Sequence, residues 1–328
     1  MYTIKSKHNK NVRNGKRKNM YKYLYIYNYS PHEQQLCEME FRRLFKENMT
    51  SKYYLSNTYF DYTRSVFIKG RLNIMYSSDN FDKIVEFIEE SQMCYYEFKV
   101  IYLKNDITHV DYQESLEKCR QIAHPIDGSV NMQEPKVIFA ITKLHNQWYF
   151  GTYDDELVWS HCYEKPHSYS HSLNIRDART LVNIAVGQET SLKLIDPCCG
   201  VGTVVLEALS MGIDIEGYDI NREVSYQARC NLEHFGYDPS VIQRKDMRII
   251  EKQYDVVIMD IPYGVYSPFS YEQQLDLLKG AFSLAPSLLL VSHIPMNKEL
   301  ETLGYEILDC ATIIKGSFQR YMTLCWKK

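Results

Sequence analysis

The second half of the chain alternates short apolar runs with amphipathic stretches, and this alternation constrains the fold more than any other feature. Runs of strand length are "SLKLIDP", "DIEGYDI", "SVIQRKD", "YDVVIMD" and "SLLLVSHI". Between them lie stretches with helical spacing, such as "GTVVLEALSMG" and "REVSYQARCNLEHFG". Strands and helices that alternate in this way predict a mostly parallel, doubly wound α/β sheet. An antiparallel hairpin is predicted at its end, because only Gly-Ser-Phe-Gln separates "YEILDCATIIK" from "RYMTLCWKK".

The first half of the chain lacks this regular alternation and mixes both patterns. Strand-like alternation occurs in "YKYLYIYNYS", "YEFKVIYL", "KVIFAITKL" and "WYFGTY". Helical spacing places Cys37, Phe41, Leu44 and Phe45 on one face of "PHEQQLCEMEFRRLF", and "NFDKIVEFIEES" has the same spacing. We therefore predict an α+β domain with an antiparallel sheet over residues 20–153.

Two polar segments complete the predicted organisation. Residues 154–174 are expected to link the first domain to the α/β domain at residues 175–328. The histidines of this linker are irregularly spaced, so exposed histidines are favoured over a metal site. Residues 1–19 carry seven Lys or Arg and no acid, which predicts a disordered basic tail. A basic arm that binds phosphate is the alternative interpretation.

Cysteine usage, hydropathy and charge restrict the compartment and the partners. The nine cysteines are scattered, with no Cys-x-x-Cys pair and no zinc spacing, which is typical of a reducing compartment such as the cytoplasm. No apolar run approaches the roughly 20 residues that span a bilayer, and residues 1–19 lack the apolar stretch of a signal peptide. We therefore expect neither a membrane protein nor a secreted one. Because the net charge of −3 includes the basic tail, the rest of the chain is acidic, and nucleic-acid binding would need a local basic surface.

A glycine turn joins a strand to a helix in "IDPCCGVGTVVLEA". Ligands of open α/β sheets bind at the carboxyl ends of the strands, near the point where the strand order reverses. Gly200 and Gly202 let the backbone approach a ligand closely, and Thr203 is the predicted N-cap of the helix. Val205 stands where a dinucleotide fingerprint has its third glycine, and no Gly-Lys-Ser/Thr is present. Asp196 at the start of the turn would repel a pyrophosphate, so a cation suits the site better.

Two further acids follow the next two predicted strands, and together they indicate S-adenosylmethionine, which carries an ammonium and a sulfonium but no phosphate. Asp219 is placed to accept both ribose hydroxyls, with Ile220 packed on the adenine. Asp246 is placed to accept the adenine amino group, with Met247 alongside. Taken singly, each acid is more often a turn residue or a helix cap. The predicted cofactor-binding residues are Asp196, Pro197, Gly200, Gly202, Thr203, Asp219, Ile220, Asp246 and Met247.

The segment "MDIPYGV" supplies a fourth acid, Asp260, at the end of the fourth predicted strand. Pro262 fixes its own φ and restricts Ile261 to extended conformations, which holds the Asp260 carboxylate in place. Carboxylate and carbonyl acceptors that grip an exocyclic amine would orient its lone pair towards the methyl sulfonium and stabilise the developing charge. The ring of Tyr263 would hold an unpaired base flat by stacking. A strand-ending turn with a core tyrosine is the alternative interpretation.

The two motifs "DPCCGVGT" and "DIPYG" together resemble class I methyltransferases that act on exocyclic amines, whose signature is Asp/Asn-Pro-Pro-Tyr. Ile261 stands where that signature has its first proline. The segment "KPHSYSHSLNIRDARTLVNIA" is similar to tRNA guanine-N2 methyltransferases, especially those that modify guanine 10. That family carries an N-terminal THUMP region that grips the tRNA acceptor end, and "CRQIAHPIDGSVNMQEPKVIFAITKLHNQWYFG" resembles its tail. The catalytic resemblance covers roughly residues 165–328.

The resemblance implies transfer of a methyl group from S-adenosylmethionine to an exocyclic amine in RNA, with guanine N2 in tRNA as the favoured acceptor. Asp260 and Pro262 would position the amine and Tyr263 would stack on the base. Three other acceptors stay open: guanine N2 in rRNA, adenine N6 in DNA and cytosine N4 in DNA. For DNA, however, no sequence-reading domain is evident. A non-catalytic RNA-binding factor on the same scaffold is the alternative of another class, and it predicts loss of the acids, all of which are present. The need for a partner subunit is open.

Overall fold

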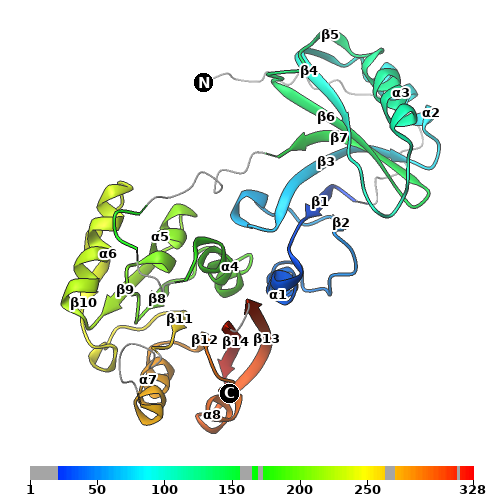
Figure 1. The fold of residues 1–328 in the computed structure, drawn as a ribbon. Coiled ribbons are helices and arrows are strands. Elements are labelled where there is room, and N and C mark those ends of the chain that lie inside the picture. The colour runs from blue at the N-terminus through cyan, green and yellow to red at the C-terminus, as the bar shows by residue number, and fades with distance from the viewer. Residues whose placement is uncertain (1–20, 156–164, 169–172, 263–269, 316–317) are drawn as a thin grey trace. The chain divides into compact units, whose positions relative to one another are not determined.

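The computed structural model describes residues 21–155, 165–168, 173–262, 270–315 and 318–328 (Figure 1). Contacts divide the chain into two compact units. The N-terminal unit comprises Met1–Leu24, Leu55–Asn57 and Leu72–Tyr153. The C-terminal unit comprises Tyr25–Tyr54, Thr58–Arg71 and Asp154–Lys328. Two segments expected in the first domain therefore belong, by their contacts, to the C-terminal unit.

The sheet of the C-terminal unit has seven strands in the order β10-β9-β8-β11-β12-β14-β13. The strands are β8 (Leu194–Asp196), β9 (Ile215–Asp219), β10 (Ile242–Arg244), β11 (Val256–Asp260), β12 (Ser287–Ser292), β13 (Tyr305–Lys315) and β14 (Phe318–Lys327). The first five in this order pair in parallel, whereas β14 runs antiparallel to β12 and to β13. The predicted α/β fold with a terminal antiparallel hairpin is confirmed. The strand order reverses between β8 and β11, so ligand chemistry is expected beside the loop that follows β8.

Buried strands explain the continuous apolar runs of this unit. Every side chain from Val256 to Met259 on β11 is buried, and so is every side chain of β12. A strand that is covered on both faces needs apolar residues at consecutive positions. The helices are α4 (Ile175–Val186), α5 (Thr203–Ser210), α6 (Arg222–His234), α7 (Tyr271–Leu284) and α8 (Asn297–Thr302), with the short turns η4 (Pro239–Val241) and η5 (Met247–Ile249).

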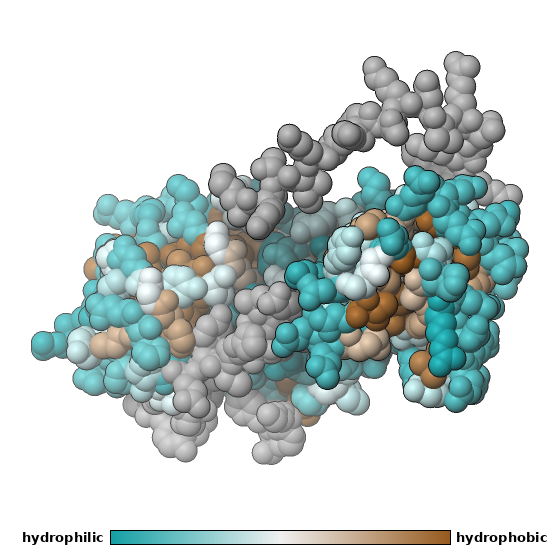
Figure 2. Space-filling model, turned by 90° about the horizontal axis from the view of Figure 1, so that it is seen from above, coloured by the Kyte–Doolittle hydropathy of each residue, from teal (hydrophilic) through white to brown (hydrophobic). Residues whose placement is uncertain are grey.

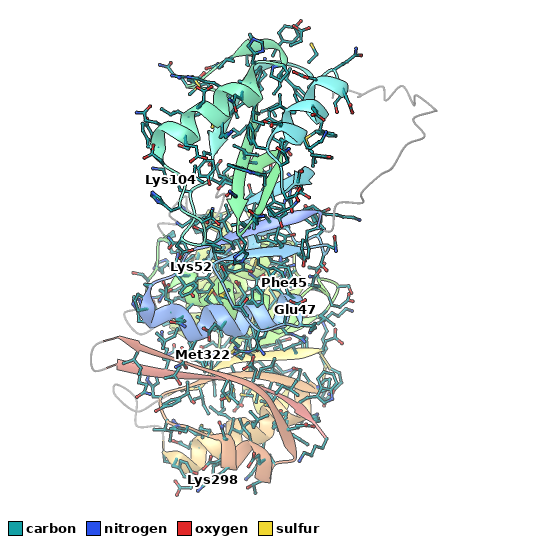
Figure 3. All side chains as sticks on the ribbon, turned by 90° about the vertical axis from the view of Figure 1, so that its right-hand side faces the viewer. Phe45, Glu47, Lys52, Lys104, Lys298 and Met322 are labelled. Atoms are coloured by element: carbon teal, nitrogen blue, oxygen red, sulfur yellow. The ribbon has the colours of Figure 1, made fainter. Side chains whose placement is uncertain are left out.

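Helix α1 (Gln34–Phe45), which follows the 3-10 turn η1 (Pro31–Glu33), packs on the C-terminal unit. It contacts α4 and β13, and Figure 3 shows it lying against the hairpin that carries Met322. The predicted apolar face of α1 is buried, as the sequence spacing indicated. Glu40 on this face accepts a hydrogen bond from Asn183 Nδ2 on α4 at 2.8 Å. These contacts are the reason that the segment around α1 clusters with the C-terminal unit.

The first half of the chain forms a second seven-stranded sheet, in the order β2-β1-β3-β7-β6-β4-β5. Its strands are β1 (Tyr23–Tyr27), β2 (Tyr53–Ser56), β3 (Ile68–Ser78), β4 (Cys94–Tyr102), β5 (Asp127–Val130), β6 (Val137–Leu144) and β7 (Gln147–Asp154). The expectation of a purely antiparallel sheet is wrong, because β4 pairs in parallel with both β5 and β6. Helix α3 (Tyr112–Ala123) carries the chain back between β4 and β5, and such a crossover produces parallel neighbours.

The core of the N-terminal unit lies between this sheet and two helices, α2 (Asp82–Glu90) and α3. Ile84 and Ile88 from α2 and Ile122 from α3 pack with the aromatic residues Phe98 and Phe139 of the strands. The 3-10 turn η2 (Tyr62–Arg64) lies in the C-terminal unit. On the face of the molecule in Figure 2, hydrophilic residues predominate and hydrophobic ones show between them. Within the described parts of the chain, no helix is both long and apolar enough to span a membrane.

Candidate active site

Three strand ends and one turn bring the four predicted acids to the same edge of the C-terminal sheet. Asp196, Asp219 and Asp260 are the last residues of β8, β9 and β11, which are parallel. Asp246 lies two residues beyond the end of β10, where it caps η5 by accepting a hydrogen bond from Arg248 N at 3.0 Å. The carboxyl ends of parallel strands meet at one edge of the sheet, and this register is what gathers the acids.

The glycine turn after β8 depends on two residues with positive φ, Gly200 (54°) and Gly202 (81°). A Cβ at Gly200 would meet open space, so only its backbone conformation demands glycine. A Cβ at Gly202 would lie 3.1 Å from Ile242 Cδ1 and 3.3 Å from Ala228 Cβ, so close packing adds to the demand there. The backbone N–H of Gly200 donates to Asp219 Oδ2 at 3.0 Å. The turn is thereby fixed to the end of β9 while the space above Gly200 stays open.

The predicted N-cap role of Thr203 is wrong. Gly202 occupies the N-cap position of α5 in the left-handed region, and no side chain caps this helix. Thr203 is the first residue of the helix, and its Oγ1 accepts a hydrogen bond from Lys165 Nζ at 2.6 Å. A left-handed glycine brings the chain directly into the helix, so Thr203 lies one position too late to cap it.

Uncompensated negative charge surrounds this turn. Asp196 is buried, and its Oδ1 accepts a hydrogen bond from the N–H of Cys198 at 3.2 Å. Burial raises the pKa of Asp196 well above its ordinary value, and the nearby Asp260 and Asp219 raise it further. Burial also raises the pKa of Asp219, although the N–H groups of Asn221 and Gly200 lower it. Within the described residues, neither Asp196 nor Asp219 forms an ion pair, so the site suits a cationic ligand and disfavours a phosphate.

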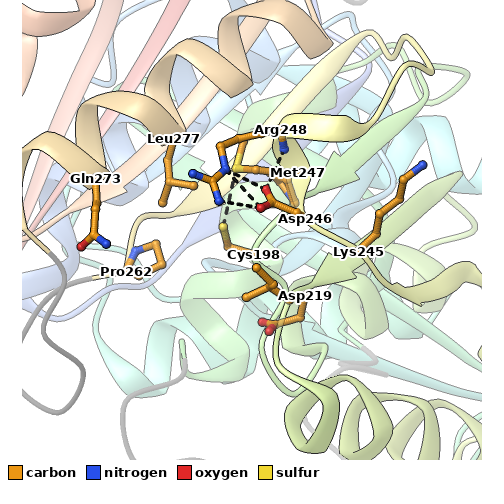
Figure 4. Close-up of a pocket in the computed structure, with 11 residues that line it drawn as sticks. Cys198, Asp219, Lys245, Asp246, Met247, Arg248, Pro262, Gln273 and Leu277 are labelled. Atoms are coloured by element: carbon orange, nitrogen blue, oxygen red, sulfur yellow. Dashed lines mark hydrogen bonds and ion pairs between the residues drawn. The ribbon is translucent and has the colours of Figure 1, made fainter.

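A pocket of about 170 Å³ opens beside the same strand ends (Figure 4). Five of the predicted cofactor-binding residues line it: Pro197, Asp219, Ile220, Asp246 and Met247. Its other lining residues are Cys198, Lys245, Arg248, Pro262, Gln273 and Leu277. Met247 is buried, whereas 61% of Ile220 is exposed, so Ile220 provides an exposed apolar surface at the rim of the pocket. A flat group with polar edges, such as an adenine with its ribose, fits this mixture of apolar walls and carboxylates.

Both carboxylate oxygens of Asp246 accept hydrogen bonds from Arg248. Arg248 Nη2 lies 2.6 Å from Asp246 Oδ2, and Arg248 Nε lies 2.9 Å from Oδ1. Hydrogen bonding to Arg248 holds the pKa of Asp246 below its ordinary value. Dashed lines in Figure 4 mark this fork, which the sequence analysis did not foresee.

Asp260 at the end of β11 differs from the other acids. Its side chain is 21% exposed, and its Oδ1 is buried without a hydrogen-bond partner among the described residues. Burial raises the pKa of Asp260 to about 6, with Arg320 lowering it and Asp177 raising it. Because an unsatisfied buried acceptor costs about 1–3 kcal/mol, a donor supplied by a ligand would be bound favourably at Oδ1.

The turn after Asp260 is held by two hydrogen bonds. Ile261 N donates to the carbonyl of Val291 on β12 at 3.0 Å, and the Ile261 side chain is buried. A proline at this position has no N–H and could not make that bond. Ile261 is therefore held in place by a hydrogen bond to β12, where a proline would be held by its ring. The carbonyl of Pro262 accepts a hydrogen bond from Gln274 Nε2 at 2.9 Å. Tyr263, the predicted stacking residue, lies outside the described residues.

Sequence reasoning missed two charged residues beside Asp260. Arg320 Nη2 on β14 lies 3.9 Å from Asp260 Oδ2, and Arg320 Nη1 lies 3.8 Å from Asp177 Oδ2 on α4. An arginine that opens the apolar strand "RYMTLCW" is unusual enough to have been noted. Its meeting with Asp260 depends on the antiparallel return of β14, which brings the start of that strand to the edge where the parallel strands end.

Comparison with known proteins supports the interpretation of this site. Residues 165–274 match the UPF0020 family model, described as an RMKL-like methyltransferase domain. The match confirms the resemblance to a methyltransferase domain that was inferred from the sequence. The chain is 30% identical over 127 residues to the tRNA (guanine(10)-N2)-dimethyltransferase of Methanothermobacter thermautotrophicus, covering 38% of each protein. It is 27% identical over 156 residues to the enzyme of that name from Pyrococcus abyssi, covering 44% of this chain and 46% of the other. The chain thus spans less than half the length of these two relatives.

Longer but weaker similarities are also found. The tRNA (guanine(10)-N2)-dimethyltransferase of Methanocaldococcus jannaschii is 24% identical over 265 residues, covering 65% of this chain and 72% of the relative. Among solved structures, TrmN from Thermus thermophilus aligns over 93% of this chain and 99% of its own, with 14% identity and a TM-score of 0.48.

Proposed function

We propose that the chain transfers a methyl group from S-adenosylmethionine to an exocyclic amine of a base in RNA, with guanine N2 in tRNA as the acceptor. The observation that carries the proposal is the Oδ1 atom of Asp260, an acceptor with no donor among the described residues, beside a glycine turn whose acids suit a cation. The methyltransferase family match and three relatives named as tRNA guanine-N2 dimethyltransferases support it.

The cofactor would be held by the residues that line the turn and the pocket. Asp219 would accept the ribose hydroxyls, because each of its oxygens accepts one backbone N–H and keeps a further lone pair. Ile220 and Met247 would pack on the adenine. Asp246 would accept the adenine amino group only if Arg248 shares or releases its oxygens. Asp196, Pro197, Gly200, Gly202 and Thr203 would surround the cationic methionine portion.

The reaction then depends on how the chain holds the acceptor amine. When bound, the cofactor supplies a methyl group whose carbon–sulfur bond breaks, with the electron pair kept on sulfur, as the nitrogen–carbon bond forms. An exocyclic amine is a poor nucleophile because its lone pair is delocalised into the ring. Asp260 Oδ1 and a backbone carbonyl would accept its hydrogens and aim its lone pair at the methyl group. The Asp260 carboxylate would stabilise the positive charge that develops on nitrogen, which then releases one proton to solvent. Tyr263 would stack on the base.

For the first half of the chain we propose an RNA-binding role of the THUMP type. The support is the resemblance of "CRQIAHPIDGSVNMQEPKVIFAITKLHNQWYFG" to the tail of a THUMP region. We propose residues 20–153 as this domain, 154–174 as the linker and 175–328 as the catalytic domain, with Tyr25–Tyr54 and Thr58–Arg71 as parts of the first domain that cluster with the C-terminal unit. A cytoplasmic location follows from a tRNA substrate, and the proposal leaves a partner subunit open.

Methyl transfer with labelled cofactor tests the proposal. The purified full chain is incubated with tRNA, rRNA or DNA from cells that lack the gene, and the modified nucleosides are identified by mass spectrometry. We expect label in N2-methylguanosine from tRNA. Label in rRNA or DNA alone would move the substrate to the corresponding class. No transfer to any nucleic acid, with S-adenosylmethionine binding retained in calorimetry, would contradict the proposed activity.

A further inference from the structure

An arginine from the terminal hairpin reaches the edge of the sheet where the acids gather. The register of β14 against β12 pairs Tyr321 with Ser292 and Met322 with Val291, and Asp260 pairs with Val291 on the other side. Arg320 precedes these pairs, so it stands at the same edge as the end of β11. Only 8% of the Arg320 side chain is exposed, and burying an arginine is costly unless its charge is compensated.

The distances show that Arg320 approaches Asp260 without forming a hydrogen bond to it. Its Nη2 lies 3.9 Å from Asp260 Oδ2, which is within the range of an ion pair but beyond that of a hydrogen bond. The lone pairs of the Asp260 carboxylate are therefore not consumed by the guanidinium. By contrast, Arg248 occupies both oxygens of Asp246 directly. A cation held at the longer distance supplies an electric field and leaves the acceptor available.

Asp177 shares this cation. It lies in the first turn of α4, 3.8 Å from Arg320 Nη1, and its side chain is 10% exposed. Asn174 holds it by donating from Nδ2 to Asp177 Oδ2 at 2.7 Å and by accepting from Asp177 N at 2.8 Å. Asp177 thus stands in a fixed position where it draws the guanidinium away from Asp260 and adds a second negative charge.

The charged and titratable groups that act on Asp260 come from the elements packed around it. Arg320 from β14 favours its ionised form, and Asp177 from α4 opposes it. The Asp260 carboxylate in turn raises the pKa of Asp196 on β8 and of the Cys198 thiol in the glycine turn. Arg320 is therefore the cation among the described groups that offsets this cluster of acids at the end of β11.

We propose that Arg320 is a positioning residue for the amine methylation, which keeps the Asp260 carboxylate ionised while leaving Oδ1 open to the substrate amine, and that Asp177 limits its effect. The inference rests on the proposed function. It assigns to the hairpin a part in the chemistry that the motifs "DPCCGVGT" and "DIPYG" do not reveal. The guanidinium acts only through Asp260 and touches neither the cofactor nor the base.

The test is the single-turnover rate of methyl transfer to unmodified tRNA between pH 5 and 9, for the full chain and its variants. In R320M the acidic limb of the pH–rate profile, where the rate falls as Asp260 becomes protonated, should move to higher pH by about one unit or more. The reason is that the cation that favours the carboxylate is lost. The rate should fall about fivefold at pH 6 and about twofold at pH 7, with the KM for S-adenosylmethionine changed less than about twofold. In D177N the same limb should move downwards, and R320K should lie between R320M and the parent.

Opposite shifts distinguish this role from a structural one, because loss of packing cannot move the limb in two directions. R42M is the matched control: Arg42 forms an ion pair with Asp309 on the neighbouring strand of the hairpin, at 2.8 Å, away from the acids. Its limb should coincide with that of the parent. If R320M fails to fold, D177N decides, and an unmoved limb there overturns the inference. Absence of transfer by the parent at every pH overturns the proposed function instead.

Discussion

Asp246 and Asp260 stand at two regions of one sheet edge, and each has an arginine beside it, yet the two carboxyl groups are perturbed in opposite directions. Their side chains are similarly exposed, at 23% and 21%. Arg248 lies 2.6 Å from Asp246 and is 55% exposed, whereas Arg320 lies 3.9 Å from Asp260 and is 8% exposed. The pKa of Asp246 is lowered, while that of Asp260 is raised to about 6. Hydrogen bonding to Arg248 is the main influence on the pKa of Asp246, whereas lost hydration is the main influence on that of Asp260 and outweighs the opposing effect of Arg320.

The comparison suggests that Asp260 serves catalysis and Asp246 serves cofactor binding, and activity measurements can test these separate roles. D260N should lower the single-turnover rate of methyl transfer by about 100-fold or more, because the amide cannot stabilise the charge that develops on the amine nitrogen. D246N should instead weaken S-adenosylmethionine binding about tenfold and change the rate at saturating cofactor much less. Rate and affinity are measured by rapid quench and calorimetry. Equal effects of both variants on the rate would show that the two acids do not have separate roles.

Protein stability provides a second test, in which the sign is opposite for the two acids. The pKa of Asp260 in the folded chain, about 6, exceeds the value of about 3.9 in an unfolded chain. Its contribution therefore favours folding below pH 4 and is lost as the pH rises through 6. At pH 7, D260N should raise the free energy of unfolding by about 2 kcal/mol, and the gain should vanish near pH 4.

D246N is the counterpart in that experiment, because the pKa of Asp246 is lowered. Its contribution to stability is present at pH 7 and is lost as the pH falls below the ordinary range of an aspartate. D246N should therefore destabilise the fold at pH 7 by about 1 kcal/mol or less, because asparagine still caps η5 and only the ion pair with the exposed Arg248 is lost. Urea unfolding followed by circular dichroism at both pH values measures the two variants. A gain in stability for D246N at pH 7 would contradict the assignment.

The smallest effect is expected when the exposed arginine is removed. R248M should leave Asp246 ionised at pH 7, because an ordinary aspartate is already ionised there. S-adenosylmethionine affinity at pH 7 should therefore change less than about threefold, and the acidic limb of the transfer rate should stay in place. Titration calorimetry and the pH profile measure both. A limb that moves in R248M, as it should in R320M, would erase the distinction between the two arginines.

Residue spacing was sufficient to predict the parts of the site that depend on local pattern. Each acid follows an apolar run directly or within a turn, so the period of strands and helices placed Asp196, Asp219 and Asp260 correctly at strand ends. Arg320 could not be assigned to them from its spacing, because its place depends on how far the hairpin returns along β12. Thr203 was misassigned because the conformation of Gly202, and not the residue type, decides where α5 begins.

The partner of an amphipathic helix is likewise beyond the reach of periodicity. The spacing in α1 correctly predicted a buried face but gave no information on what buries it. Aromatic residues of the first half, such as Tyr27 and Tyr54, cover Phe41 and Phe45. The rest of the surface comes from α4 and β13, with Glu40 bound to a residue 143 positions later and Arg42 to one 267 positions later. Similarly, the parallel pairing of β5 with β4 is decided by the path of α3 and not by either strand alone.

The position of α1 has a consequence for the order in which the protein acquires its structure. Chains are made from the N-terminus, so α1 leaves the ribosome long before β13 is synthesised. Phe41 and Phe45 can pack early on Tyr27 and Tyr54, but the contacts of α1 with α4 and β13 must wait until those elements have been made. Folding of the C-terminal unit during translation therefore cannot finish before β13 has been made, and a nascent chain stalled ahead of Tyr305 should leave the side of α1 that contacts β13 exposed to chaperones.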